Sequence, residues 1–137
     1  MTTETTSNKT FLKYVDTVGL ATMLGRGFYY PVDTAIDSDG RLYVVNRSIE
    51  GDNRGVRITA CDLDHEYYGT FGAFGEGDGQ FIYPTSVAID GQGRIYVSDE
   101  HLNRITVFDS SRNFARKWGV AGSGPGELDG PSGLAFD

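Results

Sequence analysis

The sequence predicts an all-β fold, and three observations lead to that fold class. Glycine accounts for 19 of the 137 residues without a collagen period, and the chain contains 8 Phe and 8 Tyr. Apolar and polar residues alternate over short segments, as strands with two unlike faces require. A unit made of several such segments also recurs along the chain, and a fixed spacing decides the architecture before any local assignment is made.

The recurrence is clearest in segments that begin with proline. Pro84-Thr-Ser-Val-Ala-Ile-Asp90 returns 47 positions later as Pro131-Ser-Gly-Leu-Ala-Phe-Asp137. An earlier copy runs from Pro31 to Asp37. The chain therefore contains at least two full copies of one supersecondary unit.

The first copy contains an insertion. Gly40-Arg-Leu-Tyr-Val44 precedes Gly93-Arg-Ile-Tyr-Val97 by 53 positions, whereas Arg57-Ile-Thr59 precedes Arg104-Ile-Thr106 by only 47. Six extra residues must therefore lie between Asn46 and Arg57.

Each copy is predicted to form four antiparallel strands. In the second copy, apolar side chains alternate along each segment, and the opposite face is partly apolar as well. A sheet with two apolar faces needs a neighbour on each face, which is how the blades of a β-propeller stack around an axis. We therefore expect a partial β-propeller of four-stranded antiparallel blades, with second-copy strands at Ser86–Asp90, Arg94–Ser98, Arg104–Asp109 and Phe114–Trp118.

Tight turns are predicted between these strands. Asp37-Ser-Asp-Gly40 and Asp90-Gly-Gln-Gly93 are hairpin signals, with glycine available for positive φ. The glycine-rich run from Gly75 to Gly79 resembles a phosphate-binding loop, but no Gly-Lys-Ser/Thr sequence follows it. We therefore interpret it as a turn between blades.

These motifs resemble the NHL-repeat family of β-propellers. The resemblance rests on Gly77-Asp-Gly-Gln-Phe81, Gly93-Arg-Ile-Tyr-Val-Ser-Asp99 and Asn103-Arg-Ile-Thr-Val-Phe-Asp109. The first copy departs from the pattern, because Asn46 stands where Asp99 stands and its following loop is expanded. The resemblance implies a ring of about six blades, so this chain is expected to be a fragment of two to three blades that needs further blades to close the ring.

The expected domain organisation follows from the copies. Residues 1–10 are expected to form a disordered tail, and residues 11–137 an incomplete NHL-type propeller. Its complete blades are predicted at about 31–72 and 84–119. Partial blades are expected at both ends, with an outer strand near Leu12–Val18 and an inner strand at Ser132–Phe136.

Composition excludes several classes of partner. The formal net charge is −7 and no basic stripe is present, which disfavours nucleic acid. Cys61 is the only cysteine, so neither an internal disulfide nor a multi-cysteine metal site can form. Neither a secretory apolar segment nor a run of membrane-spanning length is present, so we expect a cytoplasmic protein without membrane contact.

The candidate binding residues lie on one rim of the predicted propeller. Antiparallel order places the loop between strands two and three on the same rim as the connection to the next blade. Variable loops on a rigid scaffold commonly carry binding, although a solvated polar loop is the alternative. The insertion Arg47–Gly55 and the equivalent loop of the second copy supply the candidates for ligand or partner contact, which are Arg47, Asn53, Arg54, Glu100 and His101.

Other polar residues are predicted to have structural roles. Asp99 and Arg104 flank a short loop, where a carboxylate would pin the turn by accepting backbone hydrogen bonds. His65 is placed at the beginning of an outer strand, away from the candidate rim. No catalytic group or metal ligand is predicted from the spacings.

Two functions stay open at this stage. The first is a non-catalytic binding scaffold that recognises a protein or a small ligand on the loop rim, as the resemblance implies. The second, also implied by the resemblance, is a metal-dependent propeller enzyme of the amidating-lyase or lactonase kind, of which this chain would be a fragment. Only in that second case would a zinc or calcium cofactor be expected.

Overall fold

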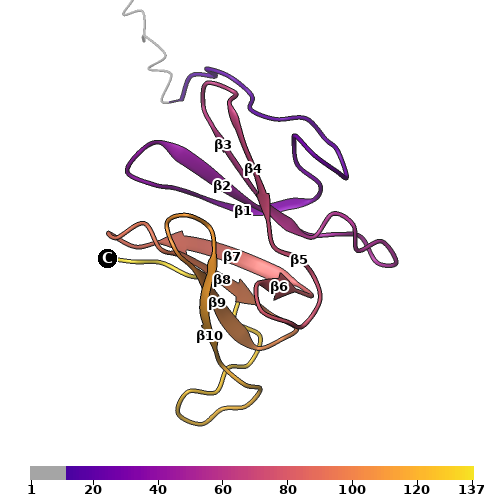
Figure 1. Cartoon of the computed structure of the whole chain (residues 1–137), viewed down its shortest axis with the longest axis vertical. Coiled ribbons are helices and arrows are strands. Elements are labelled where there is room, and N and C mark those ends of the chain that lie inside the picture. The colour runs from indigo at the N-terminus through magenta and orange to yellow at the C-terminus, as the bar shows by residue number, and fades with distance from the viewer. Residues whose placement is uncertain (1–11) are drawn as a thin grey trace, which may run out of the picture.

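The structure is a computed structural model that describes residues 12–137, and it contains two four-stranded antiparallel sheets (Figure 1). The first sheet has the order β1-β2-β3-β4 and the second the order β7-β8-β9-β10. The expected all-β fold of propeller blades is confirmed. The strands are β1 (Pro31–Ile36), β2 (Arg41–Asn46), β3 (Arg57–Asp62), β4 (Tyr67–Phe71), β7 (Pro84–Ile89), β8 (Ile95–Asp99), β9 (Arg104–Phe108) and β10 (Phe114–Trp118).

Two expected strands are not formed. The segments Leu12–Val18 and Ser132–Phe136 are irregular, and the expected tail at residues 1–10 lies outside the described part of the chain. Ladder hydrogen bonds require a second strand alongside, and residues 12–137 supply none to either segment. The later segment still follows the second blade, because the Leu134 amide donates to Ser86 Oγ and the Phe136 ring lies 4.9 Å from that of Tyr96.

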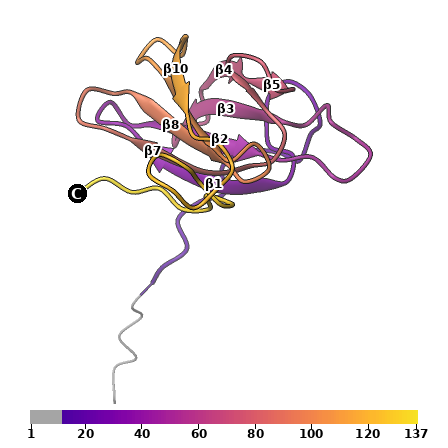
Figure 2. The same ribbon diagram turned by 90° about the horizontal axis from the view of Figure 1, so that it is seen from below.

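The main core lies between the two sheets, as the predicted stacking of blades requires. Tyr43, Val45 and Ile58 of the first sheet meet Val97 of the second, and Phe81 closes the layer with no exposed surface. The far face of the second sheet carries a smaller cluster of Tyr96, Ile105 and Val107, which Leu128 and Leu134 cover. The second blade is therefore apolar on both faces. The two blades lie next to each other in the ribbon views (Figures 1 and 2).

The connections between blades form a repeated loop with a short parallel pair. β5 (Ala73–Phe74) pairs with β6 (Gln80–Phe81), and isolated bridges join Ala21 to Phe28 and Ala121 to Leu128 at equivalent positions. The loop requires glycine at its entry. Gly72 has a φ of 76°, and a Cβ there would lie 2.6 Å from the Phe81 ring.

A buried arginine holds this loop in both blades. Arg104 at the start of β9 donates from Nη1 to the Glu76 carbonyl at 2.8 Å and from Nη2 to the Gly77 and Gln80 carbonyls at 3.0 and 2.9 Å. Arg57 at the start of β3 donates in the same way to the carbonyls of Met23, Thr22 and Gly27. The segment before the first blade therefore has the structure of the loop between the blades.

The opposite rim consists of four hairpin turns built on aspartate. The Oδ1 atom of each aspartate accepts hydrogen bonds from the amides two and four residues later, at 2.9–3.0 Å. The residue three positions after the aspartate has positive φ, which is glycine in two turns and His65 or Arg112 in the others. The turn-forming aspartates are Asp37, Asp62, Asp90 and Asp109. Over residues 12–137, no helix long and apolar enough to cross a membrane is present.

Candidate binding rim

One rim of the two blades gathers the start of each inner strand and the loop between the second and third strands. β1 and β7 begin on this rim, where β2 and β8 end, because both pairs are antiparallel. The loops from β2 to β3 and from β8 to β9 therefore lie beside the segments that lead into β1 and β7. Tyr83, which precedes the first residue of β7, lies between two hollows on this rim.

The first hollow, here called the insertion hollow, has a volume of about 650 Å³. The insertion supplies one wall through residues 47–53, and apolar side chains from both blades supply the rest. Several of these side chains are well exposed, with 57% of Tyr30 and 42% of Tyr83 accessible. The apolar lining consists chiefly of Tyr30, Val32, Ile49, Phe74, Ile82 and Tyr83.

The insertion is ordered by its own hydrogen bonds. The Asp52 amide donates to the Ile49 carbonyl at 3.0 Å, in a turn where Gly51 has a φ of 84°. The Arg54 guanidinium donates to both Asp52 carboxylate oxygens at 2.9 and 2.8 Å. This hydrogen bonding lowers the pKa of Asp52 to about 2. The wall of the hollow is therefore largely preformed.

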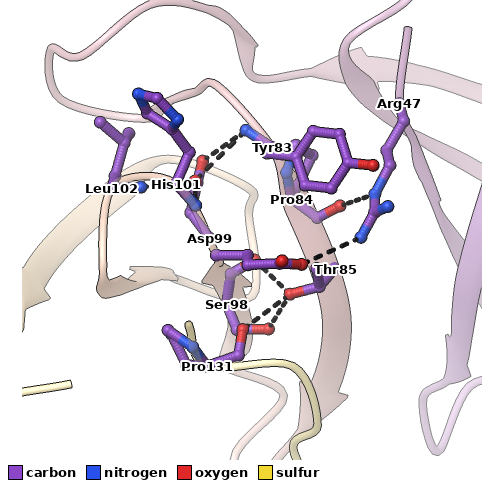
Figure 3. A network of polar contacts seen from close by, with 10 residues as sticks. Arg47, Tyr83, Pro84, Thr85, Ser98, Asp99, His101, Leu102 and Pro131 are labelled. Atoms are coloured by element: carbon purple, nitrogen blue, oxygen red, sulfur yellow. Dashed lines mark hydrogen bonds and ion pairs between the residues drawn. The ribbon is translucent and has the colours of Figure 1, made fainter. Parts of the chain in front are cut away.

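Arg47 joins the two blades across the rim. Its guanidinium lies 3.7 Å from the centroid of the Tyr83 ring, and its Nε donates to the Pro84 carbonyl at 2.8 Å. Its Nη2 lies 3.8 Å from a Glu100 carboxylate oxygen. Figure 3 shows Arg47 beside Tyr83, with its hydrogen bond to the Pro84 carbonyl dashed. The side chain is therefore engaged with protein groups, and it fixes the orientation of Tyr83.

Asp99 holds the backbone amide of the same tyrosine. Its carboxylate accepts from the amides of Ile82 and Tyr83 at 2.8 and 3.2 Å, and from those of His101 and Leu102 at 3.0 and 2.9 Å. The side chain has no exposed surface. The expected structural role of Asp99 as a turn-pinning group is what the geometry shows (Figure 3).

Asn46 has the equivalent position in the first blade but a different set of contacts. Its Oδ1 accepts from the Tyr29 amide at 2.8 Å. Its Nδ2 donates to the carbonyls of Val44 and Arg57 and to Thr59 Oγ1, at 3.0, 3.2 and 3.0 Å. An amide side chain suits this position because it faces two carbonyl oxygens and a hydroxyl group as well as the Tyr29 amide.

The second hollow, here called the acidic hollow, lies on the other side of Tyr83 and has a volume of about 600 Å³. Glu100, His101 and Asp129 line it, and all three are exposed. Asn103 Oδ1 accepts from the Gly130 amide at 2.8 Å, which holds the segment carrying Asp129 against the β8–β9 loop.

The predicted site residues divide between these hollows. Arg47 and Asn53 line the insertion hollow, and Glu100 and His101 line the acidic hollow. Arg54 lines neither hollow and is paired with Asp52. The tyrosines of the rim were not predicted, although the Tyr-Pro pair repeated at the start of β1 and β7 was a usable signal.

Two further residues lie outside this rim, and His65 was predicted to do so. His65 lies in a turn of the opposite rim, where its Nε2 is 2.9 Å from an Asp16 carboxylate oxygen. Cys61 is 6% exposed within β3, and burial raises the pKa of its thiol. A buried, protonated thiol is a core group with low reactivity.

Two stacked four-stranded sheets, joined by a repeated loop, define the class as a β-propeller built from blades. The NHL repeat profile matches residues 81–108, which cover the end of the interblade loop and the strands β7, β8 and β9. This match confirms the predicted resemblance to the NHL-repeat family.

Curated relatives agree with this family. The chain is 48% identical over 48 residues to the B-box type zinc finger protein ncl-1 of Caenorhabditis elegans, covering 35% of this chain and 6% of the relative. It is 29% identical over 109 residues to NHL repeat-containing protein 3 of Mus musculus, covering 80% of this chain and 30% of the relative. The chain therefore spans a minor part of the length of these relatives.

Two further comparisons concern an enzyme and a fold. Peptidylglycine alpha-amidating monooxygenase of Rattus norvegicus is 30% identical over 121 residues, covering 80% of this chain and 12% of the relative. A crystal structure of a protein from Bacteroides fragilis superposes with a TM-score of 0.53 at 12% identity, covering 66% of this chain and 24% of the other. The second likeness concerns the fold alone.

Proposed function

We propose that this chain belongs to a non-catalytic binding propeller whose loop rim recognises a partner protein. The observation that carries the proposal is the insertion hollow, where the one irregular loop of the repeat forms a wall around exposed aromatic and aliphatic side chains. Exposed apolar side chains gathered around a concave surface are typical of interaction sites.

The rigidity of the rim supports the same function. Arg47 holds Tyr83 from one blade, Asp99 holds it from the other, and the insertion is closed by the pair of Asp52 and Arg54. A preformed surface loses little conformational entropy on binding, so more of the contact free energy contributes to affinity.

Site-directed photocrosslinking in cells tests the proposal. A benzophenone side chain placed at Ile49 or Phe74, both 41% exposed on the insertion hollow, is expected to crosslink a protein partner. The same group at Leu63, which is 60% exposed on the opposite rim, is the matched control. The proposal fails if neither rim position gives a discrete adduct above that control.

Purified partner then allows a quantitative test. Ile49→Asp places a charge in the apolar hollow and is expected to weaken binding by at least about tenfold, or about 1.4 kcal/mol. Leu63→Asp is expected to leave the affinity unchanged. Equal affinities for the two variants would contradict a binding role for this rim.

A second candidate, a metal-dependent propeller enzyme, is favoured by the similarity to the amidating monooxygenase. The residues at hand do not fit a metal by themselves, because within residues 12–137 no three His, Cys, Asp or Glu side chains are grouped to hold one. Elemental analysis of the purified full-length protein separates the candidates. Stoichiometric zinc or calcium that survives dialysis would favour the enzyme over the scaffold.

The expected cytoplasmic location stays a prediction. Imaging of a fluorescent fusion of the full-length protein would test it.

A further inference from the structure

The two hollows of the rim differ in chemistry although they share Tyr83. In the insertion hollow, Val32, Ile49 and Phe74 are each 41% exposed, so an apolar side chain entering it would displace water from several apolar surfaces at once. The acidic hollow presents carboxylates and only one ring group besides Tyr83. A ligand that fills both hollows must therefore itself have two unlike ends.

The charges around the two hollows favour a cation. Their lining includes the carboxylates of Glu50, Glu100 and Asp129, against the single guanidinium of Arg47. That guanidinium is already stacked on Tyr83 and is 3.8 Å from Glu100. Glu100 is 49% exposed at its side chain, and Asp129 is exposed as well, so both carboxylates stay accessible to an incoming positive charge.

The position of the acidic hollow is fixed relative to the insertion hollow. Asp99 holds the backbone amides of both Tyr83 and His101, and Asn103 holds the amide of Gly130 beside Asp129. The two hollows therefore form one rigid surface with an apolar part and an acidic part, separated by a single tyrosine ring.

We propose that this surface binds an extended peptide segment of the partner that carries a bulky apolar residue and, two positions away, a basic residue. Alternate side chains of an extended peptide point to the same side and are about 7 Å apart. One such pair spans Tyr83, with the apolar side chain in the insertion hollow and the cation beside Glu100 and Asp129. The inference rests on the proposed binding function and adds the chemistry of the ligand.

The carboxylates of the acidic hollow favour a basic peptide over an acidic peptide or a nucleic acid. A phosphate or carboxylate at the acidic hollow would meet two accessible carboxylates, and like charges brought together weaken binding. The basic residue also gives the complex a salt dependence, because exposed charge pairs are screened at high ionic strength.

Isothermal titration of the full-length protein with three short peptides tests the proposal. The probe is acetyl-Phe-Ala-Arg-amide, and its controls are acetyl-Phe-Ala-Glu-amide and acetyl-Ala-Ala-Arg-amide. The probe is expected to bind with a dissociation constant on the order of 0.1–1 mM, and each control at least about fivefold more weakly. Equal binding of the Arg and Glu peptides, or no binding of the probe, would overturn the proposal.

Variants of the protein locate the binding. Glu100→Gln and Asp129→Asn are each expected to weaken binding of the probe peptide by about threefold to tenfold. This difference in affinity should become smaller in 0.5 M salt. Glu66→Gln, an exposed carboxylate on the opposite rim, is the matched control and is expected to leave the affinity unchanged. If all three variants bind the probe equally, the acidic hollow is not its site and the proposal is wrong.

These outcomes are separate from those of the proposed function. If a partner crosslinks at Ile49 and Phe74 but the Arg and Glu peptides bind equally well, the proposed binding function of the rim is supported. Only the proposal of a basic peptide is then wrong. Single-stranded oligouridylate is a further probe. If it binds the protein and Ile49→Asp abolishes that binding, the ligand of the rim is a nucleic acid and the peptide proposal is wrong.

Discussion

Arg57 and Arg104 make equivalent contacts in the two blades. Each guanidinium donates hydrogen bonds to loop carbonyls in place of backbone amides. Each guanidinium donates to three carbonyls of the loop that approaches its strand, while the residue itself is 5% or 8% exposed. Buried carbonyls must be hydrogen-bonded, and an irregular loop cannot supply enough amides of its own. A planar group with several donors in a fixed geometry is suited to that task.

Arg104→Lys should therefore destabilise the protein although the charge is kept. One ammonium cannot reach the Glu76, Gly77 and Gln80 carbonyls together, so at least one buried acceptor loses its donor, at a cost of about 2–3 kcal/mol. The free energy of unfolding from urea titration measures this. Arg116→Lys on the exposed strand β10 is the control, with an expected change below about 0.5 kcal/mol. Equal stability of the two variants would show that the hydrogen bonds from Arg104 to the loop carbonyls do not stabilise the fold.

Asn46 is the residue at which the first blade departs from the repeat, and its contacts explain the departure. Asn46→Asp would turn a carboxylate toward the Val44 and Arg57 carbonyls, to which the amide now donates. We expect a loss of about 2–3 kcal/mol at neutral pH from the buried unpaired charge and acceptors. Urea titration checks the value, and Asn53→Asp on the same loop should change stability far less. An unaltered Asn46→Asp variant would contradict the hydrogen-bond assignment.

At the scale of elements, the strands and hairpin turns were predictable because their signals are local and repeat. Proline marks the start of β1 and β7, and an aspartate marks the turns at Asp37 and Asp90. The loop before the first blade was missed because Thr22 stands where Gly75 and Gly122 mark the other two copies. The outer strand expected just before this loop, near Leu12–Val18, is not formed because it would need a partner strand to pair with.

The binding rim was predictable only in part, for a related reason. Loop order places Arg47, Asn53, Glu100 and His101 on one rim, and antiparallel geometry fixes that order. The pairing of Arg54 with Asp52 and the stacking of Arg47 on Tyr83 depend on side-chain conformations, which spacing does not determine. Tyr30 and Tyr83, which line the insertion hollow, were not among the predicted site residues.

The insertion is the element that distinguishes the two blades, so replacing it tests its role. In the variant, Glu-His-Leu copied from residues 100–102 replaces Arg47–Gly55, together with Asn46→Asp. The short loop should supply backbone amides that donate to the new carboxylate, as the His101 and Leu102 amides donate to Asp99. Most of the stability lost in Asn46→Asp alone should therefore be recovered.

The loop variant is expected to stay folded while losing the insertion hollow. Its circular dichroism spectrum and the urea dependence of its unfolding should match the parent protein. Binding of the partner should fall by at least about tenfold. A variant that binds as tightly as the parent would show that the hollow is not the recognition surface.

At the scale of the whole molecule, the blades are joined along their inner strands as well as through the core. Asp33 Oδ2 accepts from Ser86 Oγ at 2.6 Å and from the Val87 amide at 2.9 Å. The Leu134 amide donates to Ser86 Oγ in the same relation one blade later, and Thr85 Oγ1 donates to the Pro131 carbonyl at 2.9 Å. These links fix the spacing of consecutive blades, so the rim presents its loops at constant positions.

The turn aspartates make the stability of the whole molecule depend on acid. Backbone hydrogen bonding from Asn113 lowers the pKa of Asp109, and hydrogen bonding from Tyr68 lowers that of Asp62. At Asp90, burial raises the pKa, but hydrogen bonds from the amide and side chain of Arg94 outweigh it and the pKa is lowered. A carboxyl whose pKa is lower when folded stabilises the fold above its unfolded pKa of about 3.9, and this contribution is lost as the pH falls through the folded value.

The free energy of unfolding should therefore be flat between about pH 7 and pH 5 and fall steadily below about pH 4, with protons taken up on unfolding. Urea titrations at a series of pH values measure the slope. Asp109→Asn keeps the oxygen that accepts the Ser111 and Asn113 amides but cannot be protonated in this range, so its slope should be shallower than that of the parent protein. If stability instead rose as the pH fell, or if Asp109→Asn left the slope unchanged, the aspartate turns would not be what couples this fold to acid.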